Sequence, residues 1–138
     1  MILLDTNIVS EMMKVSPSEK VVIWLDSQEV SQLFISTVTI AEIAYGINAL
    51  PEGVKRSSIE KAFFKTIENG FKHRVLPFGE AAAHAYGKLM GERKSLGRPM
   101  SILDGQIAAI ALSEDAIVAT RNTRDFLDCE LELVNPFR

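Results

Sequence analysis

Met1-Ile2-Leu3-Leu4-Asp5 opens the chain, and this stretch decides the fold, because four apolar residues run directly into an acid. A short apolar run of this kind is typical of a buried strand in a parallel sheet. Ligands of such sheets bind at the carboxyl ends of the strands, which is where Asp5 is expected. Asp5 has an ordinary alternative role as the N-cap of a helix predicted at 7–13.

The rest of the chain alternates short apolar runs with longer amphipathic segments, which is typical of an α/β fold. Further helices are predicted at 17–28, 38–49, 52–69, 80–95 and from Ser101 to about 113. Further strands are predicted at 33–36, 73–76, 116–119 and 131–134. The helix at 17–28 is expected to begin with Ser16 as N-cap and Pro17 in its first turn. We therefore predict one domain, 1–138, with a central, mostly parallel sheet of four to five strands and helices on both faces.

Composition narrows the class of protein. The chain has 138 residues, 47% hydrophobic and 24% charged, as expected for one globular domain. Its single cysteine excludes an internal disulfide, and no apolar run approaches the roughly 18 residues that span a bilayer. With no signal-like segment at the N-terminus, we expect a cytoplasmic protein without a membrane partner. The net charge of −3 argues against a simple cationic coat for nucleic acid.

Acids follow other predicted strands or begin the helices beside them. Glu42 lies a few residues past the second strand, Asp104 lies in the first turn after Ser101, and Asp125 follows the fourth strand. Clustered carboxylates repel one another unless cations compensate, and oxygen ligands favour Mg²⁺ or Mn²⁺. Capping is the alternative role for each acid, because Thr39-x-x-Glu42, Ser101-x-x-Asp104 and Asn122-x-x-Asp125 all resemble capping patterns.

Four motifs together resemble a known family: MILLDTNIVSEM at 1–12, STVTIAEIAYGI at 36–47, SILDGQIAAIA at 101–111 and IVATRNTRDF at 117–126. They resemble PIN-domain ribonucleases, and most closely the toxins of bacterial VapBC-type and FitAB-type toxin–antitoxin modules. The resemblance runs from Met1 to about Pro136. It implies that Asp5, Glu42 and Asp104 are the principal metal-site acids and that Thr6 orients the first of them.

The fourth acid departs from the family pattern. Many relatives carry an aspartate where this chain has Asn122, which adds no charge. Asp125 is the candidate that partly replaces it in catalysis, and its alternative is a supporting or capping role. Asn122 itself can accept a hydrogen bond or hold a water, and Thr120 and Asn122 are candidate supporting residues.

The resemblance implies a metal-dependent endoribonuclease, the toxin of a type II toxin–antitoxin system, that hydrolyses RNA with metal-activated water. The implied partners are the RNA substrate and a cognate antitoxin that occludes the active site. A homodimer or a higher toxin–antitoxin assembly is expected, with operator DNA bound only through the antitoxin.

Two other classes of function compete with this hypothesis. A catalytically weakened PIN-fold module that binds RNA or a partner would also suit Asn122. A phosphotransfer enzyme or receiver domain also uses an aspartate after a strand, but haloacid dehalogenase-like enzymes need a second aspartate where this chain has Asn7.

Two further patterns carry predictions. Basic residues near the acids are candidates for contacts with RNA phosphates, namely Arg93, Lys94, Arg98, Arg121 and Arg124. Ala83, Gly87 and Gly91 recur at helical spacing, and they predict close helix packing.

Overall fold

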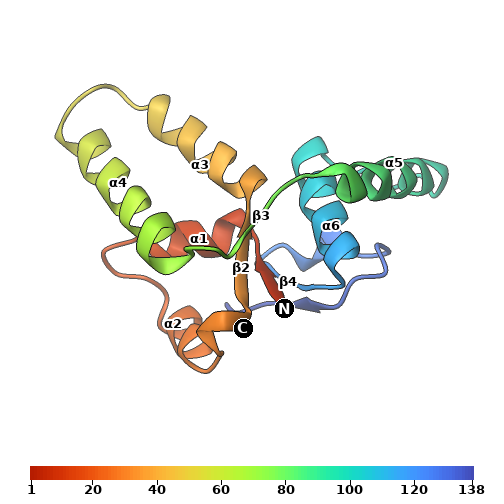
Figure 1. Ribbon diagram of the computed structural model, residues 1–138, viewed down its shortest axis with the longest axis horizontal. Helices are drawn as coiled ribbons and strands as arrows, with labels where there is room; N and C mark the ends of the chain where they lie inside the picture. The colour runs from red at the N-terminus through yellow and green to blue at the C-terminus, as the bar shows by residue number, and fades with distance from the viewer.

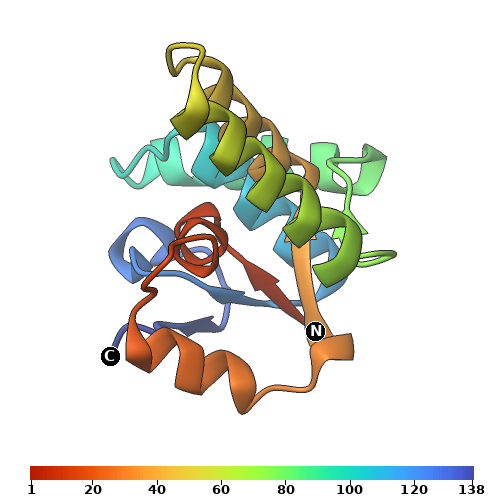
Figure 2. The same cartoon turned by 90° about the vertical axis from the view of Figure 1, so that its left-hand side faces the viewer.

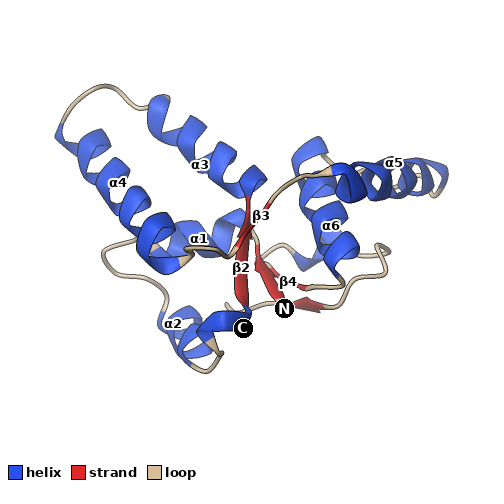
Figure 3. Cartoon of the chain, in the orientation of Figure 1, coloured by secondary structure: helices blue, strands red, loops and turns tan.

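The protein, described here over residues 1–138 by a computed structural model, folds around a five-stranded sheet in which all pairs are parallel (Figures 1 and 3). The strands are β1 (Ile2–Leu4), β2 (Leu33–Ser36), β3 (Val75–Leu76), β4 (Ile117–Ala119) and β5 (Leu133–Val134), in the order β3-β2-β1-β4-β5. The helices are α1 (Thr6–Met12), α2 (Glu19–Asp26), α3 (Thr37–Asn48), α4 (Val54–Lys65), α5 (Glu80–Ser95) and α6 (Ile102–Glu114). The predicted α/β class and parallel sheet are confirmed.

Side chains of β1 and β4 alternate between two apolar cores. Leu3 and Val118 are paired in register and belong to a core shared with α5 and α6. Leu4 and Ala119, one residue further along each strand, belong to a second core shared with α1, α2 and α3. Helices therefore cover both faces of the sheet, as predicted, and Figure 2 shows the layers from the side.

Two predicted boundaries were wrong for identifiable reasons. Helix α2 begins at Glu19, two residues later than predicted, and its N-cap Ser18 makes no side-chain capping bond. The backbone N–H of Ser18 instead donates to Glu11 Oε2 at 3.0 Å, so another helix satisfies it. Strand β3 begins only at Val75, because His73 has a left-handed φ of 64° that is incompatible with a strand.

The predicted close packing through Ala83, Gly87 and Gly91 is also wrong, because all three are exposed on α5. The close approach between α5 and α6 occurs instead at the buried Gly105. A Cβ atom added there would lie 2.5 Å from Met90 Sδ, so only glycine fits without a shift of the methionine.

The order of the strands determines which edge of the sheet can form a ligand site. The chain leaves β1 toward β2 and β3 on one side and returns to β4 and β5 on the other. The carboxyl ends of β1 and β4 are therefore adjacent at the point where the winding reverses, which is the usual ligand position in such sheets. The pairs α3–α4 and α5–α6 form two arms beyond this edge (Figure 1). No helix is both long and apolar enough to cross a membrane.

Candidate active site

Asp5 leaves β1 and caps α1, so its carboxylate is held by neutral donors. The backbone N–H of Thr6 donates to Oδ1 at 2.8 Å. Oδ2 accepts from Thr120 Oγ1 at 2.7 Å and from Asn7 Nδ2 at 3.2 Å. The capping role predicted for Asp5 is confirmed, and the same geometry fixes the orientation of its carboxylate.

The environment of Asp5 disfavours its negative charge. Only 5% of the residue is exposed. Burial raises its pKa from 3.8 to about 6, although the hydrogen bonds from Thr120 and Thr6 oppose that rise. The charges of Asp104 and Glu42 make a smaller contribution to the same rise in pKa, and the value of about 6 includes all these causes. Ionised Asp5 thus lies in a place where a cation would be stabilised.

Glu42 lies in the second turn of α3, so it does not have the capping role that the Thr39-x-x-Glu42 pattern offered as its alternative. The cap is Ser36, whose Oγ accepts from the backbone N–H of Thr39 at 3.1 Å. Glu42 Oε1 instead accepts from Thr6 Oγ1 at 2.8 Å, and Thr39 Oγ1 lies 3.0 Å from the same hydroxyl. Thr6 therefore contacts both acids, but its hydroxyl, which the resemblance implied would orient Asp5, donates to Glu42, and only its backbone N–H reaches Asp5.

Asp104 lies in the first turn of α6. Its backbone N–H donates to the capping Ser101 Oγ at 3.2 Å, which confirms the predicted cap. Burial raises the pKa of Asp104, the Ser101 hydroxyl opposes that rise, and the charge of Asp125 adds to it. Asp125 is exposed and lies outside the pocket wall, whereas Asn122 lines it.

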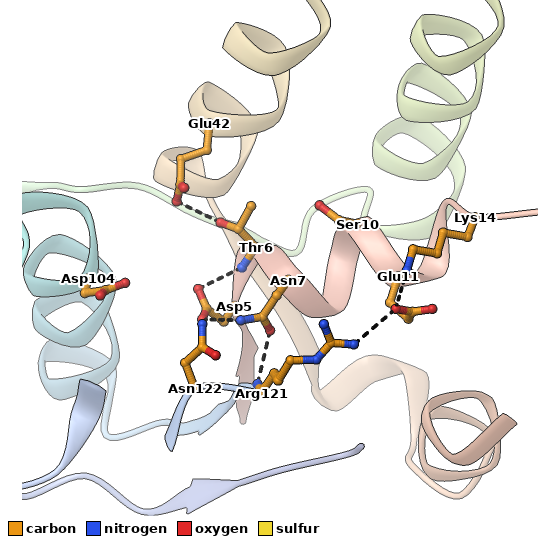
Figure 4. A pocket seen from close by; sticks show the side chains of 10 residues that line it. All are labelled: Asp5, Thr6, Asn7, Ser10, Glu11, Lys14, Glu42, Asp104, Arg121 and Asn122. Atoms are coloured by element: carbon orange, nitrogen blue, oxygen red, sulfur yellow. Dashed lines mark hydrogen bonds and ion pairs between the residues drawn. The ribbon is translucent and has the colours of Figure 1, made fainter. Parts of the chain in front are cut away.

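These segments meet in one pocket of about 370 Å³. None of its ten lining residues is hydrophobic, and Figure 4 shows them: Asp5, Thr6, Asn7, Ser10, Glu11, Lys14, Glu42, Asp104, Arg121 and Asn122. The three principal acids predicted from the sequence are therefore brought together. No three acidic, histidine or cysteine side chains converge closely enough to form a complete metal cage.

Comparison with known proteins identifies the family to which the chain belongs. The sequence profile of the PIN domain matches residues 2–129. The chain belongs to the PIN domain family. This PIN domain is 36% identical over 137 residues to a VapC ribonuclease of Sinorhizobium fredii, an alignment that covers 99% of this chain and 98% of the relative.

Two further likenesses concern a toxin and a solved complex. Toxin FitB of Neisseria gonorrhoeae is 36% identical over 137 residues, covering 99% of both chains. A solved FitAB complex bound to a DNA fragment contains a chain that matches with a TM-score of 0.92 and 36% identity, covering 100% of this chain and 96% of that one.

Sequence reasoning missed a second buried acid in this PIN domain. Glu11 is 5% exposed. It accepts from Lys14 Nζ at 2.9 Å, and Arg121 Nη2 lies 3.5 Å away. Hydrogen bonds from Lys14 and from the backbone of Ser18 lower the pKa of Glu11. The available signal was helical spacing, since Asn7, Glu11 and Lys14 recur every three to four residues and share one helix face.

The structure also separates the basic residues predicted to contact RNA. Arg93 is 6% exposed, and its guanidinium donates to the carbonyls of Arg98, at 2.7 Å, and Leu127. The prediction that Arg93 contacts RNA was wrong, because its side chain connects α5 to the loop after the short helix η3 (Thr123–Phe126). Arg98 pairs with Asp128 at 2.5 Å.

Of the five basic residues predicted to contact RNA, Arg121 alone lines the pocket. Lys94 and Arg124 are exposed outside it. Lys14, which was not among the candidates, is the other cation in the pocket wall.

Proposed function

We propose that this PIN domain is a metal-dependent endoribonuclease, the toxin component of a type II toxin–antitoxin system. The observation that carries the proposal is the meeting of Asp5, Glu42 and Asp104 in one wholly polar pocket. Membership of the PIN family and the relatives named ribonuclease and toxin support it.

The residues present fit a hard divalent cation, Mg²⁺ or Mn²⁺. The donors at the principal acids are carboxylate oxygens, with amide and hydroxyl groups beside them, which is the ligand chemistry these ions prefer. Asp5, Glu42 and Asp104 would hold the ion, which would compensate the repulsion between their carboxylates. When bound, the ion supplies a water of lowered pKa for attack on phosphorus and neutralises charge on the leaving oxygen.

The protein's own residues orient this chemistry. Thr120 and Asn7 both donate to Asp5 Oδ2, so that carboxylate keeps one orientation. Thr6 holds Glu42 through its hydroxyl. No side-chain nucleophile is needed for hydrolysis, and the pocket contains no cysteine or histidine. Asn122 adds hydrogen-bonding groups to the wall without adding charge.

The test is cleavage of RNA by protein freed of metal with EDTA and then supplied with Mg²⁺ or Mn²⁺. Cleavage is expected only with metal, and Asp5→Asn should abolish it. Asp26→Asn is the matched control, because Asp26 is an exposed acid at the end of α2 that does not line the pocket. Equal cleavage by wild type and Asp5→Asn would reject the proposal.

The presence of Asn122 in the pocket wall favours one second candidate, a weakened module that binds RNA without cutting it. The same samples decide between the two. RNA binding that is insensitive to EDTA, without cleavage at any metal concentration, would support the binding module.

We also propose that a cognate antitoxin covers the pocket. An apolar groove between α1, α3 and α4 is lined by Met13, Ile43, Ile47, Leu50 and Ile59 among others. It shares Thr6, Ser10, Lys14 and Glu42 with the acidic pocket, so a segment seated there would reach the acids. A FitAB complex bound to DNA supports a partner that carries DNA contacts.

Co-expression with a candidate cognate antitoxin tests this partner. The expected result is a stable complex without RNA cleavage, which becomes active when the antitoxin is removed. Sizing of the free toxin and of the complex tests the expected homodimer and higher assembly. Cleavage at full rate by the complex would contradict occlusion.

A further inference from the structure

The wall of the pocket beside Asn7 carries a charged rim, defined here as Lys14, Glu11 and Arg121 (Figure 4). Both cations flank the one carboxylate: Lys14 Nζ lies 2.9 Å and Arg121 Nη2 3.5 Å from Glu11 Oε1. Glu11 is nearly fully covered, with 6% of its side chain exposed, whereas 52% of the Arg121 side chain is exposed. The rim therefore presents cations, not its acid, to an incoming ligand.

Arg121 is held in place from several sides. Its guanidinium carbon lies 3.7 Å from the centroid of the Phe137 ring, in a cation–π contact. Its backbone N–H donates to Asn7 Oδ1 at 3.2 Å, and its carbonyl accepts from Asn135 Nδ2 at 3.3 Å. Ring, carboxylate and backbone contacts together restrict the guanidinium, so little conformational entropy remains to be lost when it binds a ligand.

A purely structural role does not explain this arrangement. Glu11 already accepts from Lys14 Nζ and from the backbone N–H of Ser18, at 2.9 and 3.0 Å. The Arg121 contact is longer, at 3.5 Å, and no side-chain hydrogen bond engages its guanidinium. Its side chain is therefore left with donors that make no hydrogen bond within the chain, and Arg121 is one of the residues that line the pocket.

The charges of the pocket favour an anionic ligand at the rim. Two cations and one carboxylate leave an excess of one positive charge there, whereas the other acids of the pocket would repel RNA. A guanidinium presents planar, paired donors that match phosphate oxygens. The rim therefore attracts a polyanion, and this attraction does not depend on a metal at the acids.

We propose that Arg121 binds a backbone phosphate of the RNA next to the scissile one, and that Glu11 and Phe137 are positioning residues for its guanidinium. The inference rests on the proposed ribonuclease function. Because the ligand is a phosphate, this contact favours RNA binding without reading the base sequence.

The test compares Arg121→Gln with Arg124→Gln in the full-length protein. Arg124 is a matched control, because it carries the same charge three residues away but is exposed outside the pocket. For Arg121→Gln we expect KM for RNA to rise about 10- to 100-fold, as for a lost charge-assisted bond, with a smaller change in kcat. The slope of log KM against log salt should also fall by about one, whereas Arg124→Gln should change neither quantity as much.

Two measurements distinguish the loss of a phosphate contact from a defect in folding. Thermal unfolding and calorimetric titration with Mn²⁺ alone should leave Arg121→Gln close to wild type. Phe137→Leu keeps every charge and removes the ring, so we expect a smaller rise in KM that Phe137→Tyr restores. Loss of stability without a change in KM or salt slope would show that Arg121 is structural and overturn the inference.

The outcomes separate this inference from the ribonuclease proposal. If wild type cleaves, Asp5→Asn does not, and Arg121→Gln matches Arg124→Gln in KM and salt slope, only the phosphate contact fails. If metal-loaded wild type does not cleave, or if Asp5→Asn cleaves equally, the ribonuclease proposal fails and the contact falls with it.

Discussion

Asp5 and Glu11 are two acids of one pocket, each 5% exposed, yet their surroundings shift the pKa in opposite directions. Burial raises the pKa of Asp5 to about 6, and the hydrogen bonds from its neutral donors only partly oppose that rise. Hydrogen bonds from Lys14 and the Ser18 backbone lower the pKa of Glu11, and the charges of Lys14 and Arg121 add to that effect. At Asp5 desolvation outweighs the hydrogen bonds, whereas at Glu11 the hydrogen bonds from Lys14 and the Ser18 backbone outweigh desolvation.

The difference divides the pocket into two regions. The region around Asp5 lacks a cation from the protein and is suited to take one from solution. The region around Glu11 already has its cations, and its acid serves to hold them. The predictions below test this division, from the largest expected effect to the smallest.

Neutralising each acid should have unequal consequences for metal binding. Asp5→Asn removes a proposed ligand, so we expect Mn²⁺ affinity to fall by more than about 100-fold, the upper range for residues that only orient ligands. Glu11→Gln should keep Mn²⁺ affinity, because its acid is engaged by protein cations. Calorimetric titration of the two variants checks this, and equal losses would remove the distinction between the regions.

The two acids should also act on stability with opposite signs. The folded-state pKa of Asp5, about 6, exceeds its ordinary 3.8, so the protonated form contributes stability that is present below pH 3.8 and lost as the pH rises through 6. The difference between the two values converts to about 3 kcal/mol. Metal-free Asp5→Asn should therefore be more stable than wild type by up to about 3 kcal/mol at pH 8, with little difference at pH 4.

For Glu11 the lowered pKa reverses the sign. Its ionised form contributes stability above its ordinary pKa of 4.5, and that stability is lost as the pH falls through the lower folded-state value. Glu11→Gln should therefore be less stable than wild type at pH 8. Urea unfolding of both variants at pH 4 and pH 8 measures the contrast, and shifts of the same sign would contradict it.

Thr120 tests whether neutral donors orient the metal region. Thr120→Val keeps the shape but removes the hydroxyl that donates to Asp5 Oδ2 at 2.7 Å. We expect a loss of cleavage of about 10- to 100-fold, as for other residues that orient metal ligands. Thr120→Ser keeps the hydroxyl and should recover most of the rate. Equal rates for the valine and serine variants would show that the hydroxyl is not used.

Replacing Lys14 tests the charged rim, and we expect it to have the smallest effect of these substitutions. Its side chain is 58% exposed, so its ion pair with Glu11 is screened by solvent. We expect Lys14→Gln to raise KM for RNA by about two- to five-fold, the scale of an exposed ion pair, and less than Arg121→Gln. Steady-state kinetics at low salt measure this, and a larger effect than that of Arg121→Gln would reassign the main phosphate contact to Lys14.

Local pattern was enough for much of the fold and for part of the site. The apolar runs before Asp5 and at 116–119 predicted two strands, and the Ser101 motif predicted the cap beside Asp104. The Thr39-x-x-Glu42 pattern misled, because Ser36 satisfies the helix end first and leaves Glu42 free to face Thr6. The prediction for Arg93 was wrong because its position in the sequence gives no sign that its guanidinium is buried and donates to backbone carbonyls.

The sequence by itself determined the α/β class and the strand-to-acid succession at Asp5, because hydrophobic periodicity and capping are local properties of the chain. The choice of Asp5, Glu42 and Asp104 as metal-site acids came from the resemblance to the PIN family. Only the tertiary structure decided which cations share the pocket. Arg121 reaches α1 because β1 and β4 are paired in register, Leu4 opposite Ala119, which brings Asn7 to the Arg121 backbone across 114 residues. No local pattern records a contact of that separation, so the pairing of Glu11 with Arg121 emerges only when the sheet is assembled.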